Sequence, residues 1–215
     1  MKYSVVIVAA GKGSRMGLGY NKVYAPLEDG RTILQHTMEV FQKDVECTQI
    51  VVVTEADDFH KMTGGTWPKK AVLAKGGASR QESVYHGLLA VKEDVVMIHD
   101  GARPYVKQEN LDALKDALLH HKAACLMVPC KDTISVVEDG YIVKALNRST
   151  LRAAQTPQVF ETNLILSCMK QAFEDGFTGT DDCSLVLRYS DEKITVVEGS
   201  YENIKITTRE DLRAG

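Results

Sequence analysis

The amino-acid sequence predicts an α/β fold in which helices cover both faces of a mostly parallel β-sheet. Short apolar runs rich in valine and isoleucine alternate along the chain with segments whose apolar residues recur at helical spacing. The apolar runs are continuous, as expected for strands that are buried on both faces. Near residue 131 this alternation stops and a hairpin pattern begins, which predicts an arm that projects from the core.

Length and composition fit one globular domain. The chain has 215 residues, 44% hydrophobic and 26% charged, so residues 1–215 can bury one core, with the arm at about 131–150. The net charge of −3 gives no electrostatic basis for binding nucleic acid polymers or an anionic membrane. No apolar run approaches the ~20 residues of a membrane span, and the N-terminal run is too short for a signal peptide. The five cysteines form no C-x-x-C pair, which indicates a reducing cytoplasm rather than a zinc site or disulfides.

The first element is a strand that ends in a glycine-rich loop. The run Ser4–Ala10 leads directly into Gly11–Gly17, which carries Lys12 and Arg15, and Lys22 follows. Backbone N–H groups of small residues approach an anion closely and the cations neutralise it, so the loop suits phosphate groups. It departs from the dinucleotide fingerprint, because methionine stands at the third glycine position, and from the Walker spacing. We therefore expect a nucleoside triphosphate.

The later core elements alternate as the fold class requires. In chain order they are a helix over 32–42, a strand over 50–53, a helix started by the capping box 79–82, a strand over 95–98, a helix over 110–121 and a strand over 124–128. The residues expected on the buried helix faces are Ile33, Leu34, Thr37, Met38, Phe41, Val84, Leu88, Val91, Leu111, Leu114, Leu118 and Leu119.

The arm is predicted from two short β-branched runs, 133–137 and 141–143, on either side of an Asp-Gly turn. Isolated two-stranded hairpins are marginally stable in water, so the arm needs a surface to pack against. A second subunit would provide one. A hairpin folded back onto its own sheet is an equal alternative from the pattern alone.

Candidate site residues lie at strand ends, because ligands of open α/β sheets bind beyond the carboxyl ends of the strands. Four segments should meet there: 9–15, Gly76–Gly77, 99–103 and the region of Lys205. The two glycines offer free backbone groups, and Ser83 adds a hydroxyl. Asp100 fits either a cap of the following turn or a catalytic or metal-binding role. Asp181 and Asp182 are expected as acids of a first helical turn.

Several segments together carry a family resemblance. They are Ala9–Gly17, Lys22, Gly76–Gly77 with Arg80 and Ser83, His99–Pro104, Asp132–Thr133, Arg148, Gln155–Gln158, Glu198–Gly199 and Asn203–Thr207. Recurring in this order over almost the whole chain, they resemble the 2-C-methyl-D-erythritol 4-phosphate cytidylyltransferases of the non-mevalonate isoprenoid pathway. The resemblance implies a Rossmann-like sheet, CMP transfer from CTP with release of pyrophosphate, and a homodimer whose interlocking arms each complete the neighbour's site.

The same resemblance implies a role for each site residue. Ala9, Ala10, Gly77 and Ser83 would contact the cytosine, and Gly11, Gly13, Arg15 and Lys22 the triphosphate. Asp100 and Gly101 would lie near the ribose and the acceptor. Arg103, Thr133, Arg148, Thr156 and Lys205 would hold methylerythritol phosphate, with Thr133 and Arg148 coming from the partner subunit's arm. Arg15, Lys22 and Lys205 would be catalytic.

The residue types suit this chemistry. A phosphate monoester has a second pKa of about 6 and is largely anionic at neutral pH, so it needs no strong general base to attack. Two polyanions must be brought together and charge stabilised at the α-phosphorus, a task for Arg, Lys and a divalent cation. We expect Mg²⁺ mainly on the triphosphate oxygens, with Asp100 as an optional ligand.

Two alternatives remain open at this point. Ribitol-5-phosphate cytidylyltransferases share the loop and the arm, but they commonly show Ala-Gly-Gly and Asp-Ser-Val-Arg-Pro where this chain has Ala9–Gly11 and Asp100–Pro104. Gly101 is the ambiguous position. A non-catalytic nucleotide-binding protein belongs to another class, and the presence of all four of these residues argues against it: Arg15, Lys22, Asp100 and Lys205. The chain departs from the family pattern at Asn21-Lys22-Val23, where Pro-Lys-Gln is usual, and at Ala78, where an acid is frequent.

Overall fold

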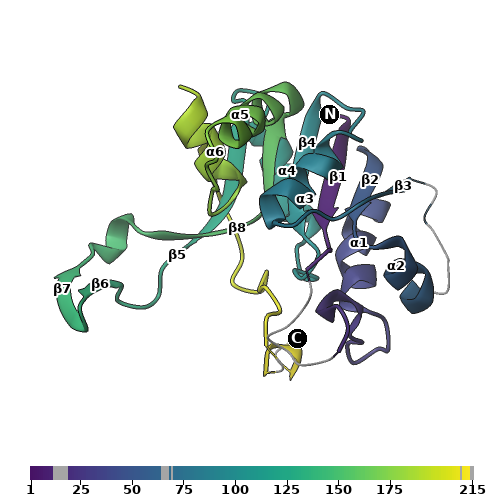
Figure 1. The fold of residues 1–215 in the computed structure, drawn as a ribbon, viewed down its shortest axis with the longest axis horizontal. Coiled ribbons are helices and arrows are strands. Elements are labelled where there is room, and N and C mark those ends of the chain that lie inside the picture. The colour runs from purple at the N-terminus through teal and green to yellow at the C-terminus, as the bar shows by residue number, and fades with distance from the viewer. Residues whose placement is uncertain (12–18, 64–67, 69, 209, 214–215) are drawn as a thin grey trace.

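The computed structural model of the protein describes residues 1–11, 19–63, 68, 70–208 and 210–213 (Figure 1). Seven strands form one sheet in the order β3-β2-β1-β4-β8-β5-β9. The strands are β1 (Tyr3–Val8), β2 (Cys47–Val53), β3 (Ala71–Ala74), β4 (Val95–Asp100), β5 (Ala123–Pro129), β8 (Arg152–Glu161) and β9 (Thr195–Glu198). The strand β8 is antiparallel to both of its neighbours, and the other strand pairs of this sheet are parallel. The predicted mostly parallel α/β class is confirmed.

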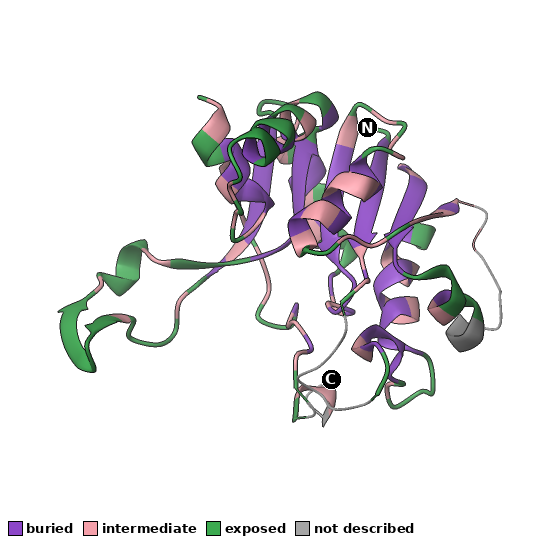
Figure 2. Ribbon diagram, in the orientation of Figure 1, coloured by how far each residue is buried: buried purple, intermediate pink, exposed green. Residues whose placement is uncertain are grey.

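Helices cover both faces of the sheet. The α-helices are α1 (Ile33–Lys43), α2 (Ala56–Thr63), α3 (Arg80–Leu88), α4 (Gln108–Ala117), α5 (Thr162–Glu174) and α6 (Asp182–Tyr189). Short 3-10 turns are η2 (Lys22–Tyr24), η3 (Arg148–Thr150) and η4 (Glu210–Arg213). Alternate residues of β1 serve the two faces: Val5 packs in the core with α1, α2 and α4, while Val6 packs with α3, α5 and α6. The strands are accordingly buried along most of their length (Figure 2).

The predicted buried faces agree with the structure except near the ends of two helices. All five predicted residues of α1 are buried, and α1 begins at a capping box formed by Thr32 and Gln35. The helix α4 ends at Ala117, so Leu119 lies beyond it and is 65% exposed, and its predicted inward position is wrong. The physical reason is that the chain leaves the helix two residues earlier and turns toward β5. Val91 likewise lies beyond the end of α3 and is only partly buried.

The arm is a separate two-stranded sheet of β6 (Ser135–Glu138) and β7 (Tyr141–Ala145). It lies far from the body at the end of the paired strands β5 and β8 (Figure 1). Asp139 and Gly140 have φ angles of 49° and 85°, and two successive positive φ values are typical of the tight hairpin turn that the Asp-Gly pair predicted. The hairpin therefore projects and does not fold back onto its own sheet. Among the described residues, no helix is long and apolar enough to cross a bilayer.

Candidate functional site

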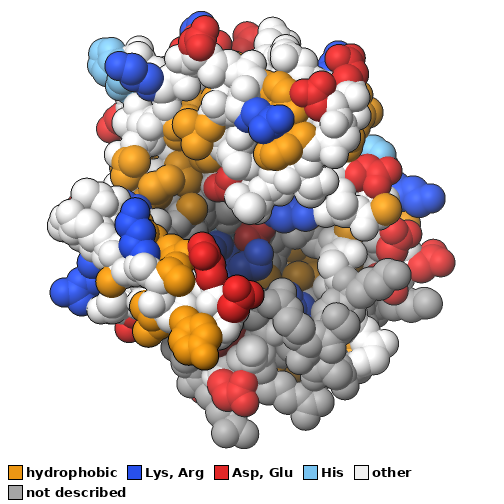
Figure 3. All heavy atoms as spheres, turned by 60° about the vertical axis from the view of Figure 1, so that its left-hand side comes forward, with side chains coloured by type: hydrophobic (Ala, Val, Ile, Leu, Met, Phe, Trp, Pro, Cys, Tyr) orange, Lys and Arg blue, Asp and Glu red, His pale blue; other side chains and the backbone are white. Residues whose placement is uncertain are grey.

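A cavity of about 530 Å³ opens where β1 and β4 end at the carboxyl edge of the sheet. Its lining combines residues 8–11, 21–23 and 77–80 with Ser83, Asp100, Ala102, Lys205 and Thr207. The four segments expected at this edge thus contribute to one cavity through their described residues. Lys and Arg side chains gather in a hollow on this side of the molecule (Figure 3), although the whole chain is acidic. The cavity is therefore a local basic site that suits a small anionic ligand.

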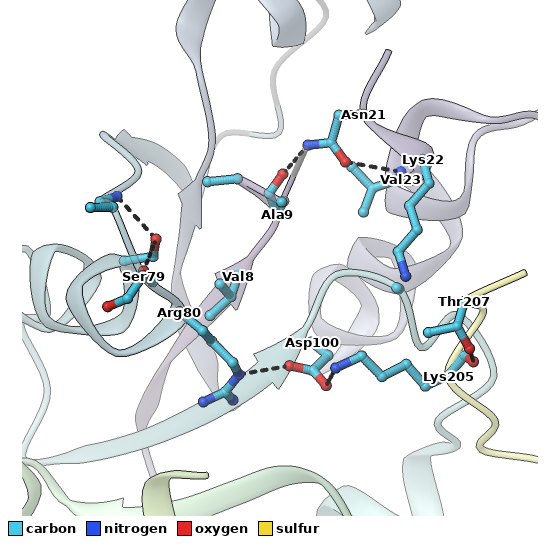
Figure 4. A pocket seen from close by; sticks show the side chains of 16 residues that line it. Val8, Ala9, Asn21, Lys22, Val23, Ser79, Arg80, Asp100, Lys205 and Thr207 are labelled. Atoms are coloured by element: carbon cyan, nitrogen blue, oxygen red, sulfur yellow. Dashed lines mark hydrogen bonds and ion pairs between the residues drawn. The ribbon is translucent and has the colours of Figure 1, made fainter. Parts of the chain in front are cut away.

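Asp100 stands at the end of β4 with a cation on each of its carboxylate oxygens (Figure 4). Arg80 donates from Nε to Oδ1 at 3.2 Å, and the Lys205 ammonium lies 2.8 Å from Oδ2. Nε of Arg103 is 3.8 Å from the same Oδ2. Burial would raise the pKa of Asp100, but the charges of Arg80 and Lys205 outweigh it and hold this pKa well below its usual range. Asp100 is therefore ionised and paired with two cations.

Arg80 is a site residue to which sequence reasoning gave no role. Besides Asp100, it binds the carboxylate of Asp182 with two hydrogen bonds, from Nη1 at 3.2 Å and from Nη2 at 2.8 Å. Asp182 is buried, and the neighbouring Asp181 is the residue that caps α6. Burial alone would lower the pKa of Arg80, but the two carboxylates raise it. The sequence held one indication of this pairing. Asp182 follows Asp181, and a helix needs only one acidic residue as its N-cap.

The two lysines of the site are tied to the segment 203–207. Lys22 donates to the carbonyl oxygen of Ile206 at 2.6 Å, and the Ile206 N–H donates to Ala102 at 2.9 Å. Arg103 donates from Nη1 to the carbonyl oxygen of Asn203 at 2.7 Å. These bonds hold Lys205 over Asp100, so a segment with no regular structure presents its side chain at a defined place.

Lys22 is itself placed by the residue before it. The Asn21 side chain accepts a hydrogen bond from the N–H of Val23 and donates to the carbonyl oxygen of Ala9 (Figure 4). Asn21 thereby caps the short turn η2 and joins it to the end of β1. The departure from the usual proline before this lysine is thus compensated by a capping asparagine.

The glycine pair before α3 is closely packed and its backbone is partly used. A Cβ on Gly77 would lie 2.5 Å from Cγ of Glu82, so only glycine fits there without a shift. The N–H of Gly77 donates to Ser83 Oγ at 3.0 Å, which corrects the expectation of a free backbone donor at this position. Ser79 caps α3, whereas the Glu82 carboxylate accepts from Ala78 at 2.6 Å instead of closing the predicted capping box.

Several predicted residues that the structure describes lie outside the cavity lining. Gly101 packs behind it, where a Cβ would meet the carbonyl oxygen of Val8 at 3.0 Å. Thr156 is buried beneath Asp100 and accepts a hydrogen bond from its N–H at 3.0 Å. Arg148 donates to Lys131 on the exposed arm, and Thr133 is exposed there too, so one chain does not bring them to the cavity. Gly13 and Arg15 lie outside the described residues.

A divalent cation would find a single carboxylate in the described part of the cavity. Within the described ranges, no group of three or more His, Cys, Asp or Glu side chains is placed to hold a metal ion. Asp100 lines the cavity, but Arg80 and Lys205 occupy its oxygens. This donor set fits Mg²⁺ that arrives on a ligand's phosphates and keeps most of its waters, with at most one protein oxygen.

Comparison with known proteins identifies the relatives of this chain. The family model described as IspD, 2-C-methyl-D-erythritol 4-phosphate cytidylyltransferase, matches residues 3–215. The enzyme of that name from Bacillus velezensis is 43% identical over 217 residues, covering 99% of this chain and 93% of its own. The one from Clostridioides difficile is 43% identical over 216 residues, covering 98% and 90%.

Solved structures agree with the sequence comparison. The 4-diphosphocytidyl-2C-methyl-D-erythritol synthase of Anaerococcus prevotii superposes with a TM-score of 0.86 at 31% identity, covering 99% of this chain and 95% of its own. The 2-C-methyl-D-erythritol 4-phosphate cytidylyltransferase of Francisella tularensis also gives 0.86, at 30% identity, covering 100% and 98%.

Proposed function

Because the chain belongs to the 2-C-methyl-D-erythritol 4-phosphate cytidylyltransferase family, we propose that it transfers CMP from CTP to 2-C-methyl-D-erythritol 4-phosphate. The products are 4-diphosphocytidyl-2-C-methyl-D-erythritol and pyrophosphate. The single observation that carries the proposal onto this chain is the cavity at the end of β4, where Arg80 and Lys205 pair with Asp100 and Lys22 lines the same cavity. It offers excess positive charge to two phosphorylated substrates.

The chemistry needs positioning and charge stabilisation more than proton transfer. The acceptor phosphate has a second pKa of about 6, so at neutral pH it is an oxygen nucleophile without a general base. It attacks the α-phosphorus of CTP in line, the new P–O bond forms, and the bond to pyrophosphate breaks. Lys22 and Lys205 neutralise the charge that develops on the phosphoryl oxygens. Lys205 exchanges Asp100 for phosphate as the substrates bind.

Arg103 supports the proposal that the acceptor's phosphate binds beside Asp100. Arg103 is largely buried, and its Nε has no hydrogen-bond partner among the described residues. A buried guanidinium donor left unpaired is costly, and an incoming phosphate satisfies it. Arg103 thus supports the role that the family resemblance implied.

Mg²⁺ would enter with CTP, bound mainly by the triphosphate, and would supply further charge neutralisation. Asp100 could provide one oxygen once Lys205 has left it. Omitting Mg²⁺ from the assay should abolish turnover, whereas the protein should remain folded because its own residues hold the site together without the ion.

A second copy of the chain would complete the site. The exposed fraction is 58% for Val137, 77% for Tyr141 and 72% for Ile142, so the arm carries an apolar surface that no described part of its own chain covers. A homodimer would bury this surface and bring Thr133 and Arg148 to the neighbour's cavity. If so, mixing Lys22→Ala with Arg148→Ala should restore activity through hybrid dimers. No recovery despite demonstrated subunit exchange would refute the shared site.

The test of the function is direct. The purified protein is incubated with CTP, Mg²⁺ and either 2-C-methyl-D-erythritol 4-phosphate or ribitol 5-phosphate, and pyrophosphate release is measured. We expect turnover with the former. Turnover of ribitol 5-phosphate alone would overturn the substrate assignment, and nucleotide binding without release on either acceptor would indicate a non-catalytic protein.

A further inference from the structure

His99 is a buried histidine next to Asp100 to which no role has been assigned. It is completely buried at the end of β4, with its ring edge-on to that of Phe41 at 5.3 Å between centroids. Both ring nitrogens have a partner: Nε2 lies 3.1 Å from the carbonyl oxygen of Arg103, and Nδ1 lies 3.0 Å from Oγ of Thr156. Burial lowers the pKa of His99 to about 4, so the ring is neutral and carries one proton.

The partners decide which nitrogen carries that proton. A carbonyl oxygen can only accept, so the bond to Arg103 requires the proton on Nε2. Nδ1 is then an acceptor, and the Thr156 hydroxyl must donate to it. The same hydroxyl accepts from the backbone N–H of Asp100 at 3.0 Å. One arrangement therefore satisfies every group, running from the Asp100 N–H through Thr156 and His99 to the Arg103 carbonyl oxygen.

This chain of bonds closes around the turn that bears the site. Its two ends are the backbones of Asp100 and Arg103, which are also joined by the Arg103 N–H donating to the Asp100 carbonyl oxygen at 3.0 Å. His99 and Thr156 thus fix the turn on its buried side. On the side of the cavity, Arg80 and Lys205 hold the Asp100 carboxylate. The single hydroxyl proton of Thr156 is committed to His99, which leaves none for a phosphate in this state.

We propose that His99 is a positioning residue, which acts through Thr156 and the Arg103 carbonyl oxygen to fix the Asp100–Arg103 turn in its reactive geometry. Because Arg80 still holds the Asp100 carboxylate and Lys205 stays available for phosphate when His99 is changed, substrate binding should survive while alignment for transfer suffers. The loss should appear in kcat and not in KM. The kinetic test of this inference rests on the proposed function, whereas the hydrogen-bond chain itself does not.

Substitutions separate positioning from packing. His99→Gln keeps a donor near the Nε2 position and removes the acceptor at the Nδ1 position, to which Thr156 donates. Thr156→Val removes the hydroxyl at nearly constant shape. One lost hydrogen bond is worth about tenfold in rate at most, so each variant should lower kcat by about that factor, with both KM values within about twofold of wild type. The double variant should lose no more than either single one, because both break the same chain. Thr156→Ser keeps the hydroxyl, so its kcat should stay near that of wild type.

Ser4→Ala is the matched control. The Ser4 hydroxyl donates to Gln49 at 2.8 Å. Ser4 is as completely buried as His99 and lies at the end of β1 that is remote from the cavity. Its kcat should be unchanged although one buried hydrogen bond is lost. A fall in kcat for Ser4→Ala equal to that for His99→Gln, or additive losses in the double variant, would overturn the proposal.

A second readout is independent of turnover and of whether His99→Gln folds. Long-range proton–nitrogen NMR correlations of the wild-type imidazole should show the neutral form protonated at Nε2, both free and with CTP and Mg²⁺ bound. The form protonated at Nδ1, or an imidazolium at pH 7, would refute the bond chain. If the wild-type protein shows the expected form but turns over neither acceptor, the proposed function fails while the positioning network stands.

Discussion

The ion pair between Asp182 and Arg80 should be a main contributor to both stability and site geometry, and Asp182→Asn tests it. The Asp182 side chain is 2% exposed and that of Arg80 is 31% exposed, and both carboxylate oxygens accept from the guanidinium. Removing one partner of a buried pair costs about 3–5 kcal/mol. Burial outweighs the charge of Arg80 and raises the pKa of Asp182, which disfavours its charged form. Because of this penalty, and because Arg80 keeps Asp100 as a second partner, we expect the lower end, about 3 kcal/mol.

The measurement is urea unfolding, in which a change of midpoint at constant slope reports a change of stability. Asp181→Asn is the control, because it makes the same charge change one residue away and asparagine caps a helix as well as aspartate. Its cost should be about 1 kcal/mol, from the weakened bond that Gln158 donates to Asp181. If Asp182→Asn costs no more than Asp181→Asn, the buried ion pair does not contribute as its geometry indicates.

Three further outcomes follow from the structure. Lys22→Ala should lower kcat by a factor on the order of 100 or more while the melting temperature stays near that of wild type, and a near-normal rate would remove its catalytic role. Asp100 has a lowered pKa, so the stability it confers is complete above its unfolded value of about 3.9 and is lost as the pH falls below that value. The difference in unfolding free energy between wild type and Asp100→Asn should therefore shrink below about pH 4, and a difference independent of pH would contradict this. Gly87→Ala would place a Cβ 2.5 Å from Cγ1 of Val6 and should destabilise by about 1–3 kcal/mol. A Cβ on Gly11 would meet no atom of the described residues within 4 Å, so Gly11→Ala should leave thermal stability unchanged.

The sequence was sufficient to predict the fold class and the edge at which the site forms. The continuous runs at 4–10, 50–53 and 95–98 are buried parallel strands because they are apolar on both faces. The strand β8 was not predicted, since its first three residues are exposed, Pro157 interrupts it, and it pairs between β4 and β5 through contacts distant in sequence. Local patterns carry no information about such an insertion.

The site was predictable in part for the same reason. Ala9, Gly77, Asp100 and Lys205 line one cavity because strand and segment ends converge at one edge of an open sheet. The pairing of Arg80 with Asp182 joins residues 102 positions apart, and no periodicity records it. Hydroxyl and imidazole orientations likewise depend on tertiary neighbours, so the sequence could single out Thr156 but not the direction of its proton.

The strand β8 has a consequence for how the arm can vary. Its exposed first three residues pair with the end of β5 and form the stem of the arm, and the residues that follow are buried (Figure 2). The buried part carries Thr156, which accepts from the Asp100 N–H. An insertion or deletion of one residue in this stem would shift the register and turn each later side chain to the opposite face. The arm is therefore not an exchangeable module. Changes in its length should be tolerated outside this stem, above all at the Asp139–Gly140 turn, where a reporter peptide could be inserted without disturbing the cavity.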